Sequence, residues 1–296
     1  EAVHMPVAVL LTDPARPSLC TARVEALRAD WGGGAVRWLA PGEAAEFDVP
    51  ETPADDDVAW SDLQSEGIDL ALVPSEGRRK RLLVADMDST LIRQECIDEL
   101  AEVAGVGAHV REITARAMNG ELDFEGALTE RVALLEGLDQ GVIDRVLAER
   151  ITHMPGGATL AATMRAAGAH TLLVSGGFTA FAEPVAAALG FDEAQANVLE
   201  AEAGRLTGAV RAPILGRDAK VAALERTAAR LGIAPEDAIA VGDGANDLAM
   251  LARAGLGVAL HAKPAVQREA RLRVNHGDLT ALLYLQGYAR AEFAAP

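Results

Sequence analysis

The sequence lacks the features that mark secreted, disulfide-bonded or membrane-spanning proteins. Its two cysteines, Cys20 and Cys96, lie far apart and form neither a disulfide framework nor a metal-ligand pair. The uncharged stretch from Ala166 to Ala182 contains a histidine, a serine and three glycines, so it is too polar to span a bilayer. We find no basic segment followed by an apolar run, as in a secretory signal, and we expect Glu1 to His4 to be non-native. These absences predict a reduced, cytoplasmic protein.

Positive charge is also scarce. The chain has 27 Lys and Arg against 44 Asp and Glu, which gives a net charge of −17. Broad binding of nucleic acid or anionic membranes needs a basic surface, so the composition argues against both. Between Arg37 and Arg78 there are 11 acidic residues and no basic one, and we expect this stretch to be a solvated face or loop.

The length predicts two domains, since a domain has roughly 100–200 residues. The 50% content of hydrophobic residues is enough to form their cores. Residues 1–78 are expected to form a small α+β unit with the order strand, helix, strand, helix, strand. The strands are predicted at 7–12, 35–40 and 68–73, and the helices at 18–30 and 58–66. Residues 41–57 are rich in proline and acid and are expected to be a loop, and residues 74–80 a linker.

The pattern changes at Arg81, where a second domain of residues 79–296 is expected. Residues 81–86 are an apolar run that ends in an acid, which is typical of a buried parallel strand. Four helical segments between Ile97 and Arg150 predict a separate helical layer. Further strands are predicted at 170–174, 238–242 and 256–260, helices at 158–167, 179–189, 218–231 and 245–253, and a hairpin around 203–204. This alternation predicts a doubly wound, Rossmann-like parallel α/β sheet.

Three of these strands end in polar clusters, at residues 86–90, 175–177 and 242–247. The carboxyl ends of strands in an open α/β sheet face one crevice, so the clusters can meet there. Each cluster alone has an ordinary structural interpretation as a helix cap or a turn. Together they predict an active site.

The composition of the clusters indicates the chemistry. Asp86 and Asp88 are two positions apart on an extended chain, so both carboxylates point the same way. Crowding them with Asp243 and Asp247 would be repulsive without a cation, and oxygen ligands of this kind suit Mg²⁺. None of the six histidines has a spacing that indicates zinc.

This constellation predicts phosphoryl transfer. Asp86 is placed to attack phosphorus and form an aspartyl-phosphate, and Asp88 to protonate the leaving alkoxide and then activate water. Ser175, the Gly176 amide and Lys220 would hold the phosphoryl oxygens. An ordinary lysine on a helix surface is a rival interpretation of Lys220, but the functional one gains weight because Lys220 opens a helix after a linker at 211–219.

The same residues resemble the motifs of a known superfamily. The segments DMDST at 86–90 and SGGF at 175–178, Lys220, and GDGANDLAM at 242–250 look like the four ordered motifs of the haloacid dehalogenase phosphatases. The longer segments at 86–102 and 118–138 are similar to the phosphoserine phosphatases within it, and the resemblance covers about residues 81–285.

The resemblance implies a role for each site residue. Asp86 would be the nucleophile and Asp88 the general acid and base. Mg²⁺ would be held by Asp86, the backbone carbonyl of Asp88 and Asp243, with Asp247 supporting from just outside. A helical cap at 95–154 would be inserted into a core of residues 79–94 and 155–296. For the substrate, Glu95 would bind the ammonium and Arg131 the carboxylate, Met118 and Phe124 would wall the pocket, and Ser175, Gly176, Lys220 and Asn246 would make the remaining contacts.

The implied activity is hydrolysis of O-phospho-L-serine, the last step of serine biosynthesis. An alternative keeps the site but transfers the phosphoryl group to another alcohol, such as homoserine. A second alternative is a non-catalytic regulator that binds amino acids through residues 1–80, against which Asp86, Asp88, Lys220 and Asp243 argue together. Residues 1–78 are similar in length and order to the ACT-like domain of some bacterial phosphoserine phosphatases. Three roles remain as alternatives for this unit: it could bind a ligand such as serine, have a purely structural role, or mediate a homodimer.

Overall fold

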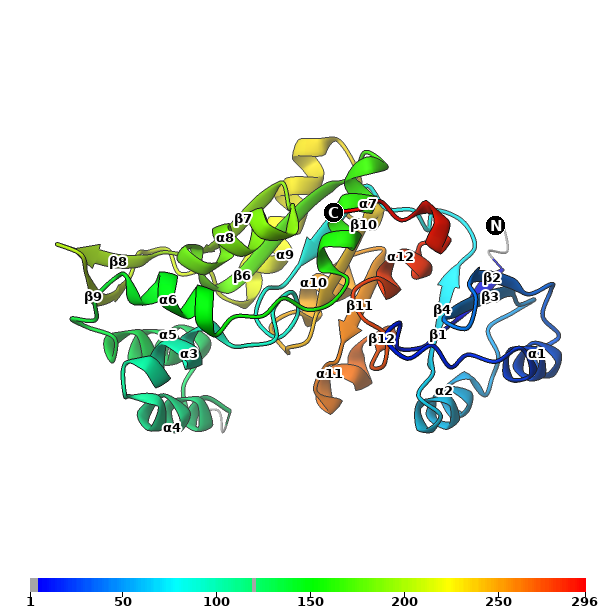
Figure 1. The fold of residues 1–296 in the computed structure, drawn as a ribbon, viewed down its shortest axis with the longest axis horizontal. Coiled ribbons are helices and arrows are strands. Elements are labelled where there is room, and N and C mark those ends of the chain that lie inside the picture. The colour runs from blue at the N-terminus through cyan, green and yellow to red at the C-terminus, as the bar shows by residue number, and fades with distance from the viewer. Residues whose placement is uncertain (1–4, 119–120) are drawn as a thin grey trace.

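The structure, a computed structural model, describes residues 5–118 and 121–296, with the side chain of Met118 excepted. Figure 1 shows three parts in a row: an N-terminal unit, a central core around a parallel sheet, and a helical cap at the far end. In the described part of the chain, no helix has the length and apolar character needed to cross a membrane.

The core is built on a six-stranded sheet in which every pair is parallel. Its order is β12-β11-β10-β5-β6-β7, with strands β5 (Leu82–Ala85), β6 (His170–Phe178), β7 (Glu193–Asn197), β10 (Ala238–Gly242), β11 (Leu256–Leu260) and β12 (Leu272–Val274). The doubly wound sheet is confirmed. The two edge strands, β7 and β12, escaped the sequence interpretation because they are short and carry polar residues.

Alternate residues of the central strands pack against helices on opposite faces. Leu83 and Ala85 face the layer that contains α7 (Gly157–Ala166), α8 (Thr179–Leu189) and α12 (Ala281–Leu285). Leu82 and Val84 face α9 (Arg217–Leu231), α10 (Leu248–Arg253) and α11 (Pro264–Glu269). Because both faces are buried, these strands are continuous apolar runs rather than alternating ones.

The cap consists of the four expected helices and one further element. The helices are α3 (Cys96–Val103), α4 (Gly107–Met118), α5 (Phe124–Ala133) and α6 (Val142–Glu149). The hairpin of β8 (Leu199–Glu202) and β9 (Arg205–Val210) packs beside α5, and the Gly137 N–H donates to Leu206 O at 2.8 Å. The hairpin was predicted, but as part of the core, and its contact with the cap joins segments far apart in the sequence.

The N-terminal unit is a four-stranded antiparallel sheet with two helices. Its elements are β1 (Pro6–Leu11), α1 (Thr21–Asp30), β2 (Arg37–Ala40), β3 (Ala44–Asp48), α2 (Asp56–Ser65) and β4 (Asp69–Pro74), and the sheet order is β2-β3-β1-β4. Ala8, Leu10 and Phe47 pack against the helices, whereas Val7 and Val9 belong to the apolar cluster that includes α12 of the core. Strand β3 lies in the stretch expected to be a loop, so that prediction was wrong.

The acidic stretch is also less solvated than expected, because three of its carboxylates are buried against the core. Glu46 pairs with Arg78 at 2.7 Å, and Glu43 accepts from Tyr284 Oη at 2.7 Å and from Arg290 at 2.6 Å. Arg78 is buried and also donates to Leu285 O at 3.1 Å. The expected linker at 74–80 is therefore fixed to the core at Arg78.

Asp69 is the third of these buried acids and is fully inaccessible. Its carboxylate accepts the backbone N–H groups of Asn275, His276 and Gly277 at 2.8 to 2.9 Å. These residues form the loop after β12, so one side chain of the N-terminal unit satisfies three donors of the core.

We expect Asp69→Ala to lower the free energy of unfolding by at least about 2 kcal/mol, because it leaves buried donors without an acceptor. The measurement is urea unfolding followed by circular dichroism. Asp62→Ala, at an exposed position of the same unit, is the matched control. Equal midpoints for the two variants would contradict the role assigned to Asp69.

Candidate active site

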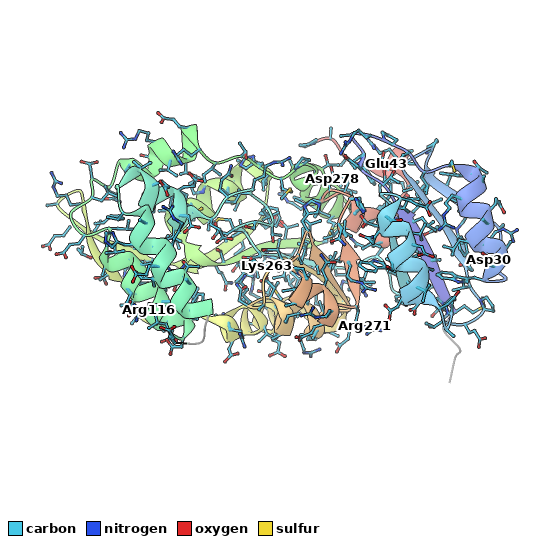
Figure 2. All side chains as sticks on the ribbon, turned by 90° about the horizontal axis from the view of Figure 1, so that it is seen from below. Asp30, Glu43, Arg116, Lys263, Arg271 and Asp278 are labelled. Carbon is cyan, nitrogen blue, oxygen red and sulfur yellow. The ribbon has the colours of Figure 1, made fainter. Side chains whose placement is uncertain are left out.

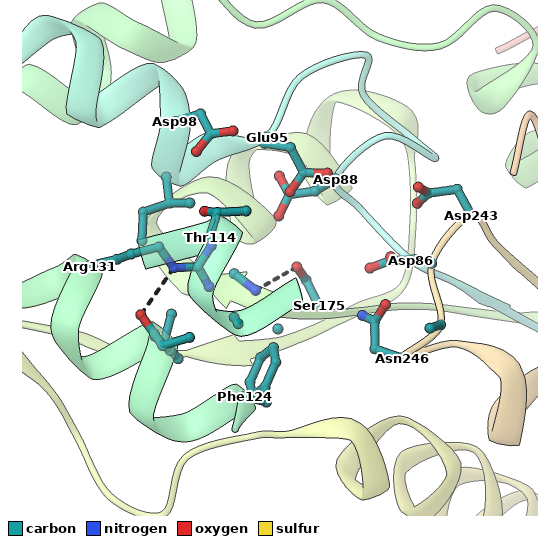
Figure 3. Close-up of a pocket in the computed structure, with 18 of the residues that line it drawn as sticks. Asp86, Asp88, Glu95, Asp98, Thr114, Phe124, Arg131, Ser175, Asp243 and Asn246 are labelled. Atoms are coloured by element: carbon teal, nitrogen blue, oxygen red, sulfur yellow. Dashed lines mark hydrogen bonds between the residues drawn. The ribbon is translucent and has the colours of Figure 1, made fainter. Parts of the chain in front are cut away.

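The three polar clusters meet at one edge of the core sheet, as predicted. Asp86 and Asp88 follow β5, Ser175 to Gly177 lie near the end of β6, and Asp243 to Asn246 follow β10. These strands are neighbours in the order β10-β5-β6, so their carboxyl ends are adjacent. Together with the cap they enclose a cavity of about 450 Å³ (Figure 3).

Lys220 lies beneath the cavity, between two carboxylates. It projects from α9, its side chain is 3% exposed, and its Nζ is 2.7 Å from Asp86 Oδ1 and 2.6 Å from Asp247 Oδ1. Burial acts to lower the pKa of Lys220, but the two carboxylates raise it above its usual value. The interpretation of Lys220 as a surface lysine is therefore wrong.

Asp86, Asp243 and Asp247 form a carboxylate cluster in which one oxygen of each lies within 4.8 Å of the others. Burial raises the pKa of Asp86 well above its usual value, and burial and the charge of Asp247 raise the pKa of Asp243 to about 6. Lys220 pairs with Asp86 and Asp247 but makes no salt bridge with Asp243 in the described part of the chain. An all-oxygen donor set with excess negative charge fits a hard divalent cation such as Mg²⁺.

Asp88 has the properties of a group that exchanges protons. Burial and the nearby Glu95 carboxylate raise the pKa of Asp88 to about 7, while the Cys96 N–H, which donates to Asp88 Oδ1 at 3.0 Å, opposes this shift. A Cβ atom at Gly177 would lie 2.9 Å from Asp88 Oδ2, so the glycine makes room for the carboxylate. A carboxyl group that titrates near neutral pH can both donate and accept a proton in turn.

The cap supplies the other side of the cavity. Arg131 and Phe124 extend from α5, and Figure 3 shows them opposite Asp86, Asp243 and Asn246. Arg131 Nε donates to Ala127 O at 3.1 Å. Burial lowers the pKa of Arg131, against the effect of the acids Asp98, Glu95 and Asp88.

Two neighbouring contacts fix other predicted residues. Glu95 precedes α3 and accepts from Ser89 Oγ at 2.7 Å. Phe124 packs so closely on Gly176 that a Cβ atom there would be 2.9 Å from Phe124 Cζ. These contacts hold the Glu95 carboxylate and the Phe124 ring against residues of the core beside the cavity.

Most of the predicted site residues line one cavity: Asp86, Asp88, Glu95, Phe124, Arg131, Ser175, Gly176, Asp243 and Asn246. Lys220 and Asp247 do not line the cavity but lie behind it, where Lys220 pairs with both Asp86 and Asp247. Met118 ends α4, and its side chain lies outside the described residues.

Sequence reasoning missed several residues at this site, and three of them carry polar or charged groups that matter to its geometry. Asp98 and Lys263 line the cavity, whereas Asn197 lies behind it and supports the glycine turn. The Asn197 side chain donates to Gly176 O at 2.9 Å and accepts from the Leu215 N–H at 2.7 Å, which ties the glycine turn to the segment before α9. Asp98 could have been found because it is one helical turn after Glu95, but the contacts of Asn197 and the position of Lys263 depend on the fold.

Comparison with known proteins finds relatives that cover much of this chain. Among curated proteins, the phosphoserine phosphatase of Streptomyces coelicolor is 49% identical over 232 residues, which are 77% of this chain and 56% of that protein. This chain thus spans less than two thirds of the length of the first curated relatives that it matches.

Two solved structures resemble nearly the whole chain. A HAD family hydrolase from Salmonella enterica serovar Typhi has a TM-score of 0.85 at 30% identity and covers 95% of this chain and 98% of its own. A probable phosphoserine phosphatase from Vibrio cholerae has a TM-score of 0.79 at 32% identity and covers 98% and 88%.

The family model of haloacid dehalogenase-like hydrolases matches residues 83–252, more than half of the sequence. The matched range contains the strand ends that meet at the cavity as well as the whole of α9, which carries Lys220. The chain therefore belongs to the haloacid dehalogenase-like hydrolase family.

Proposed function

We propose that the protein hydrolyses O-phospho-L-serine to L-serine and phosphate. One observation carries the proposal: a single cavity has the Asp86 carboxylate on its core side and both Glu95 and Arg131 on its cap side. A phosphate monoester can react with the Asp86 carboxylate. The ammonium and carboxylate of a free amino acid can pair with Glu95 and Arg131. The phosphoserine phosphatases among the relatives support the same substrate.

In the first step Asp86 attacks phosphorus, and the bond between phosphorus and the serine oxygen breaks as the aspartyl-phosphate forms. Asp88, in its neutral form, gives its proton to the leaving alkoxide. In the second step Asp88 removes a proton from a water molecule, which attacks phosphorus and releases phosphate from Asp86. Ser175, the Gly176 amide and Lys220 are proposed to stabilise the phosphoryl oxygens.

Mg²⁺ is the proposed cofactor, held by Asp86, Asp243 and the carbonyl of Asp88, with Asp247 in support. When bound, it would neutralise negative charge on the phosphoryl group and the carboxylates. The protein's own contribution is to hold the carboxylates close together, which Lys220 and the Gly244 N–H assist by binding Asp247 at 2.6 and 2.9 Å.

On substrate recognition, Arg131 is proposed to bind the substrate carboxylate and Glu95 its ammonium, with Phe124, Met118 and Asn246 as further contacts. A cavity that holds paired polar groups discriminates strongly against ligands that leave those groups unpaired. Hydrolysis is favoured over transfer to homoserine because the relatives are named as phosphatases. A cytoplasmic location, a homodimer and an ACT-like ligand site stay predictions of the sequence.

We expect Mg²⁺ to raise the thermal unfolding midpoint of the wild-type protein, since a ligand at 100 times its Kd stabilises the folded state by about 2.7 kcal/mol. Asp243→Asn should lose most of this rise relative to its own metal-free midpoint. Differential scanning fluorimetry measures both. Asp218→Asn, at an exposed position of α9, is the control and should respond like the wild type. A full response from Asp243→Asn would refute the ligand assignment.

Asp86→Asn should reduce turnover of phosphoserine by at least about 10³-fold, because an amide is not a nucleophile toward phosphorus. The variant keeps the shape of the side chain, so circular dichroism should show an unchanged fold. Phosphate release is measured at saturating Mg²⁺ and without an acceptor alcohol, with Asp218→Asn as the control. Substantial residual turnover would sink the proposed mechanism, and release that required an acceptor would favour the transferase.

Arg131→Ala should raise KM for phosphoserine roughly 10- to 100-fold, the value of a lost hydrogen bond between charged groups. KM for p-nitrophenyl phosphate, which has no carboxylate, should change much less. Arg111→Ala removes an exposed arginine of the cap that does not line the cavity and serves as the control. Equal effects on both substrates would mean that Arg131 does not bind the substrate carboxylate.

A further inference from the structure

Lys263 is a lysine at the cavity for which the mechanism above has no use. It follows β11, immediately precedes α11, and lines the same cavity as Asp86 and Asp243. In Figure 2 it lies in the middle of the molecule, between Arg116 of the cap and Asp30 of the N-terminal unit. The sequence contains three lysines, and two of them, Lys220 and Lys263, are at this site.

Of the three lysines, Lys263 has the least engaged ammonium group within the described residues. Lys80 Nζ donates to Glu236 O at 2.9 Å, and Lys220 lies between two carboxylates. Lys263 makes neither a side-chain hydrogen bond nor a salt bridge in that part of the chain, and its side chain does not cap α11. An exposed ammonium at the mouth of an acidic cavity is free to bind an anionic ligand.

The charges around the cavity divide into two groups. Five acids line it, namely Asp86, Asp88, Glu95, Asp98 and Asp243, against two cations, Arg131 and Lys263. Arg131 interacts electrostatically with Asp98, Glu95 and Asp88, which places it in the cap-side group. Lys263 lines the cavity together with Asp243, whose pKa its charge lowers, so it belongs to the core-side group, where the phosphate of a substrate would react with Asp86.

The backbone that presents Lys263 is built to hold one conformation. His261 has a φ of 47°, in the left-handed region that non-glycine residues rarely adopt. Its N–H donates to Val274 O at 2.8 Å, and its ring Nε2 lies 2.8 Å from Gly277 O. Gln267 Nε2 donates to Ala262 O at 2.7 Å. These contacts fix the turn on both sides of Ala262, so the position of Lys263 is defined although its side chain is exposed.

We propose that Lys263 is a further substrate-binding residue, whose ammonium attracts the phosphate dianion into the cavity and binds it there before Asp86 attacks. The inference rests on the proposed function in one respect, that the substrate is a phosphate monoester. Lys220 cannot serve this purpose during entry, because it is buried behind Asp86 and neutralised by its two carboxylates. A free cation at the rim acts on encounter and binding, and its effect is screened by salt.

The test compares Lys263→Ala, Lys263→Arg and Arg268→Ala at saturating Mg²⁺. Arg268 is an exposed cation of α11 that does not line the cavity, so its variant controls for net charge and for the helix. Lys263→Ala should lower kcat/KM for phosphoserine roughly 5- to 10-fold at low ionic strength, with the loss falling to within about 2-fold at high salt. Lys263→Arg should keep most of the wild-type value, and Arg268→Ala should keep all of it.

Inhibition by inorganic phosphate is a second measurement, and it can be made even if the variant turns over slowly. Its inhibition constant should rise in Lys263→Ala by a factor similar to the loss in kcat/KM. An unchanged kcat/KM at low salt, a loss that persists at high salt, or a loss equal to that of Arg268→Ala would each overturn the proposal. A loss that disappears when Mg²⁺ is raised at constant ionic strength would also overturn it, because it would place the effect on the metal.

The same series with p-nitrophenyl phosphate separates this inference from the proposed function. If the wild-type protein hydrolyses p-nitrophenyl phosphate but not phosphoserine, the proposed substrate is wrong. The role of Lys263 is then decided by the salt-dependent loss with p-nitrophenyl phosphate alone. If phosphoserine is hydrolysed and Lys263→Ala behaves as the wild type, the inference fails and the proposed function stands.

Discussion

The ion triad of Asp86, Lys220 and Asp247 is the interaction on which the site depends. Burying two carboxylates at neighbouring strand ends costs several kcal/mol per ion unless they are paired, and Lys220 meets both at 2.6 to 2.7 Å. Because Lys220 comes from α9, the triad also fixes that helix beneath the ends of β5 and β10. Asp86 is thereby oriented toward the cavity, while the partner that holds it is kept out of reach of solvent.

The triad leaves the site negatively charged, and this determines how an acidic protein can bind an anion. The net charge of −17 describes the whole chain, whereas under the proposed function the phosphate would meet a local arrangement of Lys220 below, Lys263 at the rim and the proposed Mg²⁺. Arg131 stands apart on the cap, where under the proposed function it would face the other end of the substrate. Separating the cations in this way would give a zwitterionic phosphate ester one orientation in the cavity.

The central parts of the fold and site could be predicted because they follow from local patterns. Apolar runs that end in Asp86 or Gly242 indicate buried parallel strands, and the geometry of a parallel sheet then brings the ends together. Strand β3 could not be found in this way, because Glu43 and Glu46 resemble solvated acids until Arg78 and Arg290 meet them from distant parts of the chain. The cavity position of Lys263 likewise depends on the turn after β11, which contacts between separate segments define.

These long-range contacts also connect the N-terminal unit to the catalytic cavity. Asp69 holds the backbone N–H of Gly277, and the carbonyl of Gly277 contacts the ring of His261, two residues before Lys263. The interface is polar and specific rather than only apolar, since Asp69 needs three backbone donors in one arrangement. A unit attached in this way fixes its own orientation on the core and supports the loop that positions the rim of the site. The N-terminal unit thus contacts the core at the loop that supports the turn before Lys263.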